Sequence, residues 1–215
     1  MPRPRFAKLA SEKKHAILNA ALEAFAIHGF DGASYNQIIE RAGISKGAMY
    51  YYFDDKEDLY ATVVRHELED ILAEFHDFPT ASSPEEFWEV LDQFMAQALQ
   101  FFNEHPLKVR LVRTVWKLRA EGIKSPLIQE LFDMGRGFSV QLLQLGQSLG
   151  AVRDDLPFEL LVNLVTAVDE AGDMWLADNL DVISEEEFRT WGMAFTDLLR
   201  RMLEPTLVKN GKKNH

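Results

Sequence analysis

The chain of 215 residues contains no cysteine. It therefore has no disulfide framework, no thiolate zinc site and no cysteine nucleophile, which agrees with a reducing cytoplasm. No apolar run approaches the roughly 20 residues that a membrane-spanning helix needs, and the N-terminus lacks the apolar core of a signal peptide. We therefore expect a soluble, cytoplasmic protein without a membrane partner.

The sequence also lacks several motifs that mark common enzyme classes. It has no Walker glycine loop, no H-E-x-x-H and no G-x-G-x-x-G. Its histidines show no metal-ligand spacing, and the acidic residues beside His66 are typical of a solvated face. We expect no catalytic residues, no metal site and no cofactor.

The alternating pattern of a β-strand is missing as well, so we predict an all-α protein of about nine helices. Prolines divide the second half of the chain at helical lengths, and proline is favourable at the first helical position because its missing N–H would be unpaired there. A Ser184–Glu187 capping box starts the last helix. The predicted helices of this half cover residues 84–105, 106–121, 126–149, 157–178 and 184–204.

The net charge of −11 is unevenly distributed along the chain. Residues 1–50 hold seven Lys or Arg and four acidic residues, a net charge of +3, which leaves −14 for the remainder. This asymmetry suits a protein that presents one end to phosphate. Arg3 and Arg5, interrupted by prolines, lie in a predicted non-helical basic arm. The arm can be interpreted as a minor-groove contact or as an unstructured, solvated tail.

The segment from Ser34 to Leu59 predicts two short helices joined by a tight corner. Ser34 and Ser45 can cap the two helix starts, and Gly43 permits the positive φ of the corner. Apolar residues give each helix a side to bury, and the second helix then presents outward Lys46, Gly47, Tyr50, Tyr51 and Tyr52. Because lysine neutralises phosphate and tyrosine hydroxyls bond to it, we interpret the segment as a DNA-binding helix-turn-helix.

The same residues closely resemble the tetracycline-repressor (TetR) family of bacterial transcription regulators. The resemblance covers about residues 13 to 64. Ile39 and Met49 depart from the family pattern but keep their positions apolar. The alternative is a plain helical hairpin with exposed tyrosines. The matching residues are Ile17 to Ala21, Phe25, Gly29, Ala33, Ser34, Ile38, Ala42 to Gly47, Tyr50 to Phe53 and Lys56 to Leu59.

Residue chemistry and the motif match together predict the DNA contacts. Lys46, Tyr50 and Lys56 are expected at phosphates, and the helix start at Ser34 also faces phosphate. Base edges are expected nearest Gly47, Ala48 and Tyr51, with Gln37 as a second reader. The complete predicted set is Ser34, Gln37, Ser45, Lys46, Gly47, Ala48, Tyr50, Tyr51, Tyr52 and Lys56, with Arg3 and Arg5 of the arm.

The last two predicted helices are rich in large apolar side chains. Two copies of this helix pair could form a four-helix bundle, and the family resemblance implies a homodimer through these helices. Some of the residues could instead belong to the internal core. The predicted interface comprises Leu161, Leu164, Val168, Trp175, Phe188, Trp191, Phe195 and Leu199.

The resemblance also implies a small-molecule effector that binds within the helical body and weakens DNA binding. No ligand motif is readable, so the candidates are polar groups that interrupt apolar stripes and large apolar side chains beside them. For each of them a helix-edge or core position is the better explanation. If an effector binds here, the apolar side chains favour one that is hydrophobic or amphipathic. The candidates are Phe102, His105, Trp116, Arg119, Phe138 and Asp169.

The sequence thus predicts a transcriptional regulator, a repressor that binds palindromic double-stranded DNA as a homodimer and is released by an effector. Residues 1–58 form the arm and the DNA-binding head, residues 59–208 the regulatory and dimerisation body, and residues 209–215 a disordered basic tail. Two alternatives remain: a DNA-binding protein of the same fold without an effector, architectural or partner-regulated, and an activator.

Overall fold

The computed structural model describes residues 3–75, 80–123, 125–179 and 182–205. Within these residues the protein consists of ten helices and has no strand, which confirms the prediction of an all-α fold. This is one helix more than the nine that we predicted. The additional helix is α1 (Pro4–Ala7), which lies in the arm that we predicted to be non-helical. The predicted tail, residues 209–215, lies outside the described residues.

The described residues divide into two compact units. Unit 1 takes the residues up to 75 and residues 101–131, and unit 2 takes residues 80–100 and those from 132 onward. The division differs from the predicted boundary between residues 58 and 59, because α5 and α7 pack with the N-terminal helices.

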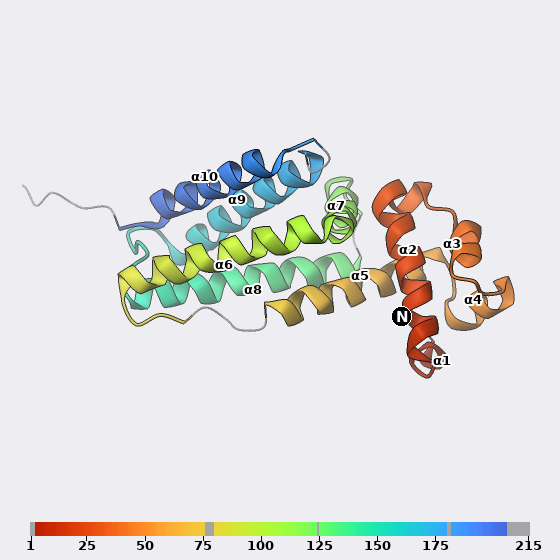
Figure 1. The fold of residues 1–215 in the computed structure, drawn as a ribbon. Helices are drawn as coiled ribbons and strands as arrows, with labels where there is room; N and C mark the ends of the chain where they lie inside the picture. The colour runs from red at the N-terminus through yellow and green to blue at the C-terminus, as the bar shows by residue number, and fades with distance from the viewer. Residues whose placement is uncertain (1–2, 76–79, 124, 180–181, 206–215) are drawn as a thin grey trace, which may run out of the picture. The chain divides into compact units, whose positions relative to one another are not determined.

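Unit 1 is built around α2, which contacts α3, α5 and α7. Side chains from these helices and α4 form one apolar core, with Phe25 of α2, Ile38 of α3 and Met49 of α4 fully buried. The Tyr60 hydroxyl of α5 lies 2.6 Å from Thr114 Oγ1 of α7. The helices of unit 1 are coloured red to orange and green in Figure 1. They are α1, α2 (Ser11–Gly32), α3 (Tyr35–Arg41), α4 (Lys46–Tyr52), α5 (Lys56–Glu74) and α7 (Pro106–Ala120).

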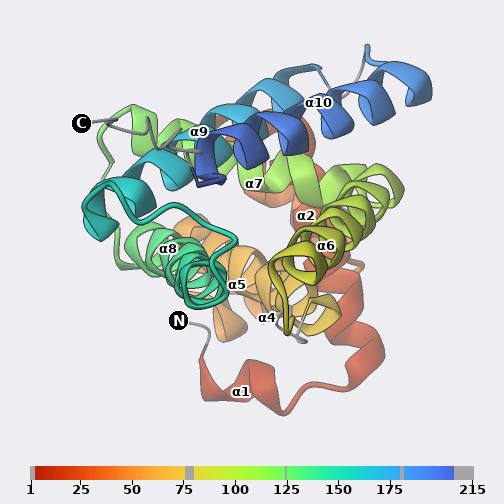
Figure 2. The ribbon, with the colours of Figure 1, turned by 90° about the vertical axis from the view of Figure 1, so that its left-hand side faces the viewer.

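Unit 2 contains most of α6 (Pro84–Glu104) and α8 (Pro126–Ser148), together with α9 (Phe158–Asn179) and α10 (Glu185–Leu203). α9 and α10 lie together on one side of α6 and α8 (Figures 1 and 2). The core of this unit gathers at one end, where the first turns of α6 meet the second half of α8 and the first half of α9.

The helix starts follow the local sequence signals closely. Pro84, Pro106 and Pro126 are each the first residue of a helix, as predicted, and α9 begins one residue after Pro157. The Ser184 hydroxyl and the Glu187 carboxylate form the predicted capping box of α10. No helix in the described part of the chain is long and apolar enough to cross a membrane.

Candidate nucleic-acid interface

The corner between α3 and α4 has the predicted capped geometry. Ser34 Oγ accepts a hydrogen bond from the Gln37 amide at 3.4 Å, and Ser45 Oγ accepts one from the Ala48 amide at 3.1 Å. Gly43 lies between the two helices with φ = 65°. Because that conformation strains any residue with a Cβ atom, glycine is what allows the two helices to turn this sharply.

The outer side of α4 carries the side chains that were predicted to meet DNA. Tyr50 and Tyr51 are 43% and 47% exposed, and Lys46 and Gly47 are also exposed. An added Cβ atom at Gly47 would meet no other protein atom within 4 Å. The internal packing of the chain therefore does not require glycine there, whereas a close approach to a DNA groove would.

Other members of the predicted set are less open. Gln37 and Ser45 are exposed, while Ser34, Ala48 and Tyr52 are half-buried. The Tyr52 ring packs edge-on against Phe6 of α1, with ring centroids 6.2 Å apart. Tyr52 thus serves partly as an anchor for the arm, which differs from the predicted outward placement.

The arm is folded against the head in this structure. Phe6 is buried against Phe53, with ring centroids 4.8 Å apart. Arg3 Nε donates a hydrogen bond of 3.0 Å to Asp54, and the Arg5 guanidinium lies 4.4 Å from the centroid of the Tyr51 ring. The basic groups of the arm are therefore held beside the end of α4. Phe6 was missed in the sequence, because one aromatic residue beside prolines gives no periodic signal.

Lys56 has an internal role that the motif did not reveal. Its ammonium donates to the carbonyl oxygens of Asp31 and Ala33, at 3.3 and 3.2 Å, and lies 4.7 Å from the centroid of the Phe30 ring. It therefore satisfies carbonyl groups at the C-terminal end of α2, where cations are favourable. Of the two lysines in the predicted set of α4 and its surroundings, Lys46 is therefore the one whose side chain is exposed on α4.

A further sequence pattern at this corner has an ordinary structural explanation. Residues Gly43 to Gly47 match G-x-S-x-G, the pattern of a hydrolase nucleophile elbow. We did not predict a hydrolase site here. That elbow requires a strand before the serine, whereas α3 precedes Ser45 here and its hydroxyl caps α4. The pattern therefore belongs to the helix-turn-helix corner.

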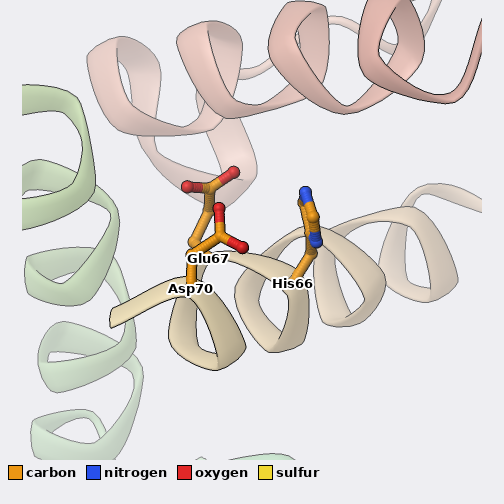
Figure 3. Close-up of side chains that lie close together, drawn as sticks. All are labelled: His66, Glu67 and Asp70. Atoms are coloured by element: carbon orange, nitrogen blue, oxygen red, sulfur yellow. The ribbon is translucent and has the colours of Figure 1, made fainter. Parts of the chain in front are cut away.

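One cluster of side chains in unit 1 has the composition of a metal site. His66, Glu67 and Asp70 of α5 offer ligand atoms within 4.8 Å of one another (Figure 3). The Lys108 ammonium of α7 lies 2.7 Å from Glu67 and 3.2 Å from Asp70. A protein cation therefore already pairs with both carboxylates, and the cluster is explained as an ion-pair network.

The predicted effector residues fall in both units. Unit 1 contains four of them: Phe102, Trp116 and the exposed His105 and Arg119. Unit 2 contains the other two, Phe138 and Asp169. His105 precedes the first residue of α7, and its ring packs on Phe101 rather than extending an apolar stripe of α6. Within unit 2, Phe138 stacks on Phe94, and Asp169 lies half-buried on α9.

The predicted dimer residues separate into internal and exposed groups. Leu161, Phe188 and Leu199 are buried within their own chain and contribute to its core. Val168, Trp191 and Phe195 are half-buried, and Trp191 stacks between Trp175 and Phe195. Leu164 and Trp175 are 38% and 44% exposed on one side of α9. Leu160 of α9, and Met193 and Leu198 of α10, were not in the predicted set but are also exposed.

α3 and α4 are two short helices joined at a capped glycine corner. The outer side of α4 carries a cation, an open glycine and phenol side chains. This arrangement defines a helix-turn-helix DNA-binding protein. Comparison with known proteins agrees. Residues 17–63 match the family model described as bacterial regulatory proteins, tetR family. This part of the chain is thus similar to the DNA-binding region of TetR-family transcriptional regulators.

Two curated relatives illustrate the extent of the likeness. The HTH-type transcriptional regulator RutR of Escherichia coli (strain K12) is 36% identical over 104 residues, which are 48% of this chain and 48% of RutR. The chain thus matches about half the length of RutR. The HTH-type transcriptional repressor BepR of Brucella suis biovar 1 (strain 1330) is 26% identical over 167 residues, 74% of this chain and 78% of BepR.

Solved structures extend the likeness in fold to nearly the whole chain. A TetR family transcriptional regulator from Chloroflexus aurantiacus J-10-fl has a TM-score of 0.68 and 25% identity, and the match covers 94% of this chain and 98% of that one. FadR from Bacillus subtilis, solved in complex with stearoyl-CoA, has a TM-score of 0.68 and 16% identity, with 87% and 97% covered. The second likeness concerns the fold alone.

Proposed function

We propose that this protein is a cytoplasmic repressor that binds palindromic operator DNA as a homodimer and releases it when a small molecule binds in its helical body. The observation that carries the proposal is the outer side of α4. There Lys46, Gly47, Tyr50 and Tyr51 are exposed beside a capped helix start, and Arg5 lies against Tyr51. Lys46 and Tyr50 contact phosphates, and Gly47 and Tyr51 lie nearest the bases.

Dimerisation is supported by the exposed apolar side chains of α9 and α10. Leu160, Leu164 and Trp175 follow one another along α9 at helical spacing, and Met193 and Leu198 are exposed on α10. Two copies that pair through these helices bury this surface and present two heads to one duplex. A palindromic operator matches that two-fold symmetry, since each half-site binds one head.

Release by an effector is supported by what is known of similar proteins. The Bacillus subtilis FadR structure contains stearoyl-CoA, and SmeT of Stenotrophomonas maltophilia is the repressor of a multidrug efflux pump. In this chain, the large half-buried side chains of unit 2, such as Phe94 and Phe138, offer an apolar lining for a small molecule.

The proposal is tested by binding the purified protein to fragments of its own upstream region across a salt series. We expect tight binding of one dimer per palindrome, with an affinity that falls steeply as salt rises. Binding that is weak and blind to sequence would favour the architectural alternative. Absence of binding at every salt concentration would overturn the proposal. Transcription from a reporter promoter then separates a repressor from an activator.

A further inference from the structure

The arm at the start of the chain is attached to the C-terminal end of α4. Phe6 is 6% exposed, and its ring packs on Phe53, which directly follows α4, with ring centroids 4.8 Å apart. The same ring meets Tyr52, the last residue of α4, edge-on at 6.2 Å. One buried aromatic side chain thus fastens the arm to the helix that carries the predicted DNA contacts.

Hydrogen bonds hold the arm at the same place. The Arg3 backbone amide donates to the Tyr52 carbonyl oxygen at 3.0 Å, and Arg3 Nε donates to the Asp54 carboxylate at 3.0 Å. The Phe6 amide donates in turn to the Arg3 carbonyl oxygen at 2.9 Å, so this part of the arm is a turn of helix. An ion pair between exposed groups contributes little, and burial of Phe6 is therefore the main anchor. Arg5 lies inside this turn, which fixes its place beside α4.

Arg5 covers the face of one tyrosine of α4. Its guanidinium carbon is 4.4 Å from the centroid of the Tyr51 ring, within the roughly 6 Å at which a cation–π interaction acts. The Tyr52 ring also contacts Tyr51, in a T-shaped arrangement with centroids 5.3 Å apart. Tyr51 therefore has two neighbours that restrict its ring, although the residue is 47% exposed.

These contacts link the arm to Tyr51 by two routes. One is direct, from the Arg5 guanidinium to the ring. The other passes from Phe6 to Tyr52 and from Tyr52 to Tyr51. A tyrosine with such neighbours has fewer accessible side-chain orientations than an exposed tyrosine on a bare helix. The arm thus restricts the orientation of Tyr51 before any DNA is bound.

Tyr51 lies on the side of α4 that is suited to close approach. Gly47 and Tyr51 are four residues apart, so they share one face of the helix. An added Cβ atom at Gly47 would meet no protein atom within 4 Å, which leaves this face open to a DNA groove. The neighbouring Tyr50 is held differently, by the Tyr35 ring at a centroid distance of 5.5 Å. Arg5 therefore acts on the tyrosine that lies beside the open glycine.

We propose that Arg5 and Phe6 are positioning residues that determine DNA specificity, because they hold Tyr51 in the orientation in which it meets the base edges of the operator. The inference rests on the proposed function, since it requires that α4 reads DNA. Phe6 anchors the arm, and the Arg5 guanidinium covers the Tyr51 ring. The arm then contributes to recognition through Tyr51 and not through a groove contact of its own.

Preorganisation is the physical basis of this role. A side chain that becomes immobilised only on binding loses rotamer freedom, and that loss weakens the complex. A contact that already holds the ring in the free protein removes the loss. An exposed cation–π interaction shifts an equilibrium between ring orientations about two- to fivefold. The benefit is confined to DNA whose bases suit the held orientation, so it increases specificity.

The docked arm differs from an arm that enters a neighbouring minor groove. Arms of that kind extend away from the helices of their own head. To do so here, Phe6 would leave its buried site on Phe53, and Arg3 would leave Asp54. Exposing a buried phenylalanine is unfavourable. The contacts of this structure therefore favour an arm that stays on α4.

The first test needs no DNA and uses 3-fluorotyrosine, because the chain has five tyrosines and few fluorine signals result. Tyr51→Phe assigns the Tyr51 signal in the spectrum of the full chain. Arg5→Gln and Phe6→Ala should each move this signal and leave that of Tyr60, in the core of unit 1, in place. Lys8→Gln alters an exposed cation of the same arm and should leave the Tyr51 signal unchanged. An unmoved Tyr51 signal in the Arg5 variant would overturn the inference.

The second test measures specificity as the ratio of dissociation constants for a random duplex and for the operator fragment of equal length. Arg5→Gln should lower this ratio about threefold, and Phe6→Ala should lower it by a similar factor. Removal of a positive charge weakens binding to both duplexes, so that effect cancels in the ratio. Lys8→Gln should therefore leave the ratio unchanged. A ratio that Arg5→Gln does not alter contradicts the proposal.

A double-mutant cycle then shows whether Arg5 acts through Tyr51. In a chain that already carries Tyr51→Ala, Arg5→Gln should have no further effect on the ratio, because the ring that Arg5 positions is absent. An arginine that contacts bases itself would lower the ratio by the same factor in both backgrounds. That result would refute the positioning role.

Failure of this inference can be told apart from failure of the proposed function. If the unaltered chain prefers its operator and Arg5→Gln keeps the full preference, the inference fails and the regulator proposal stands. If the unaltered chain binds no DNA at any salt concentration, the regulator proposal fails, and the inference that rests on it fails as well.

Discussion

Lys108 Nζ lies 2.7 Å from a carboxylate oxygen of Glu67, and this ion pair joins α7 to α5 inside unit 1. Both side chains are largely buried, 15% and 7% exposed. Burial acts to lower the pKa of Lys108, but hydrogen bonds and charges from Glu67 and Asp70 outweigh it and raise the pKa above its ordinary value. The ammonium therefore stays charged throughout the physiological range.

Replacing Lys108 by methionine should destabilise the protein. The substitution leaves the Glu67 carboxylate buried without its partner, and loss of one member of a buried pair costs about 3 kcal/mol. Urea unfolding measures the change in the free energy of unfolding. The double variant Lys108→Met/Glu67→Leu should recover most of the loss. A single variant within about 0.5 kcal/mol of the unaltered chain would mean that water already screens the pair.

Alanine at Gly47 should separate folding from DNA binding. An added Cβ atom meets nothing within 4 Å, and alanine favours a helix over glycine by up to about 1 kcal/mol, so stability should be maintained or rise. Operator affinity should fall, because the methyl group keeps α4 from close approach to DNA. Fluorescence anisotropy with labelled operator measures this. Gly135→Ala on α8, equally open, is the control and should leave DNA binding unchanged.

Removal of the Tyr50 hydroxyl should weaken binding to all DNA sequences alike. Tyr50→Phe keeps the ring contact with Tyr35, whose centroid lies 5.5 Å away, and loses one hydrogen bond worth about 1 kcal/mol. Tyr50→Ala should weaken binding further, again on every sequence. Affinities for operator and random duplexes of equal length provide the measurement. A loss confined to the operator would assign Tyr50 to the bases instead of the phosphates.

Tyr35→Phe should stabilise the head by about 1 kcal/mol. The Tyr35 hydroxyl is buried and has no hydrogen-bond partner among the described residues. Burial, with the charges of Tyr50, Asp55 and Asp58, raises its pKa to about 12. Since the unfolded phenol ionises near pH 10, stability contributed by this group falls as pH rises from 10 through 12.

Thermal unfolding at pH 8 and pH 10.5 tests both parts of this prediction. The Phe variant should melt at a higher temperature at pH 8, and its advantage should grow at pH 10.5. A lower melting temperature at pH 8 would mean that the hydroxyl has a stabilising partner in solution.

Leu164→Glu should convert the proposed dimer to a monomer. The side chain is exposed on the apolar side of α9, so the substitution leaves the protomer core intact while it places a charge in the proposed interface. Light scattering after gel filtration gives the mass, and anisotropy gives the accompanying loss of operator affinity. Ile123→Glu, an exposed apolar position outside α9 and α10, serves as the matched control. A dimer that persists in the Leu164 variant would move the interface elsewhere.

The sequence by itself determined the features that depend on a few neighbouring residues. Ser34, Gly43 and Ser45 define the corner because a capping hydroxyl and a left-handed glycine act within one turn of the chain. The helix starts at Pro106 and at Ser184 follow for the same reason. These signals were sufficient to predict the all-α fold and the helix-turn-helix.

Only the tertiary structure decided which distant groups meet. Arg3 and Asp54 are 51 positions apart, and Lys56 reaches back to the end of α2, so no local pattern reveals either contact. An apolar stripe predicts that a helix buries one face but does not identify its partner. Leu161 therefore looked like Leu164 in the sequence, although one is core and the other is exposed. Burial raises the pKa of Asp169 to about 7, and burial is a property of the packed chain that no local pattern reveals.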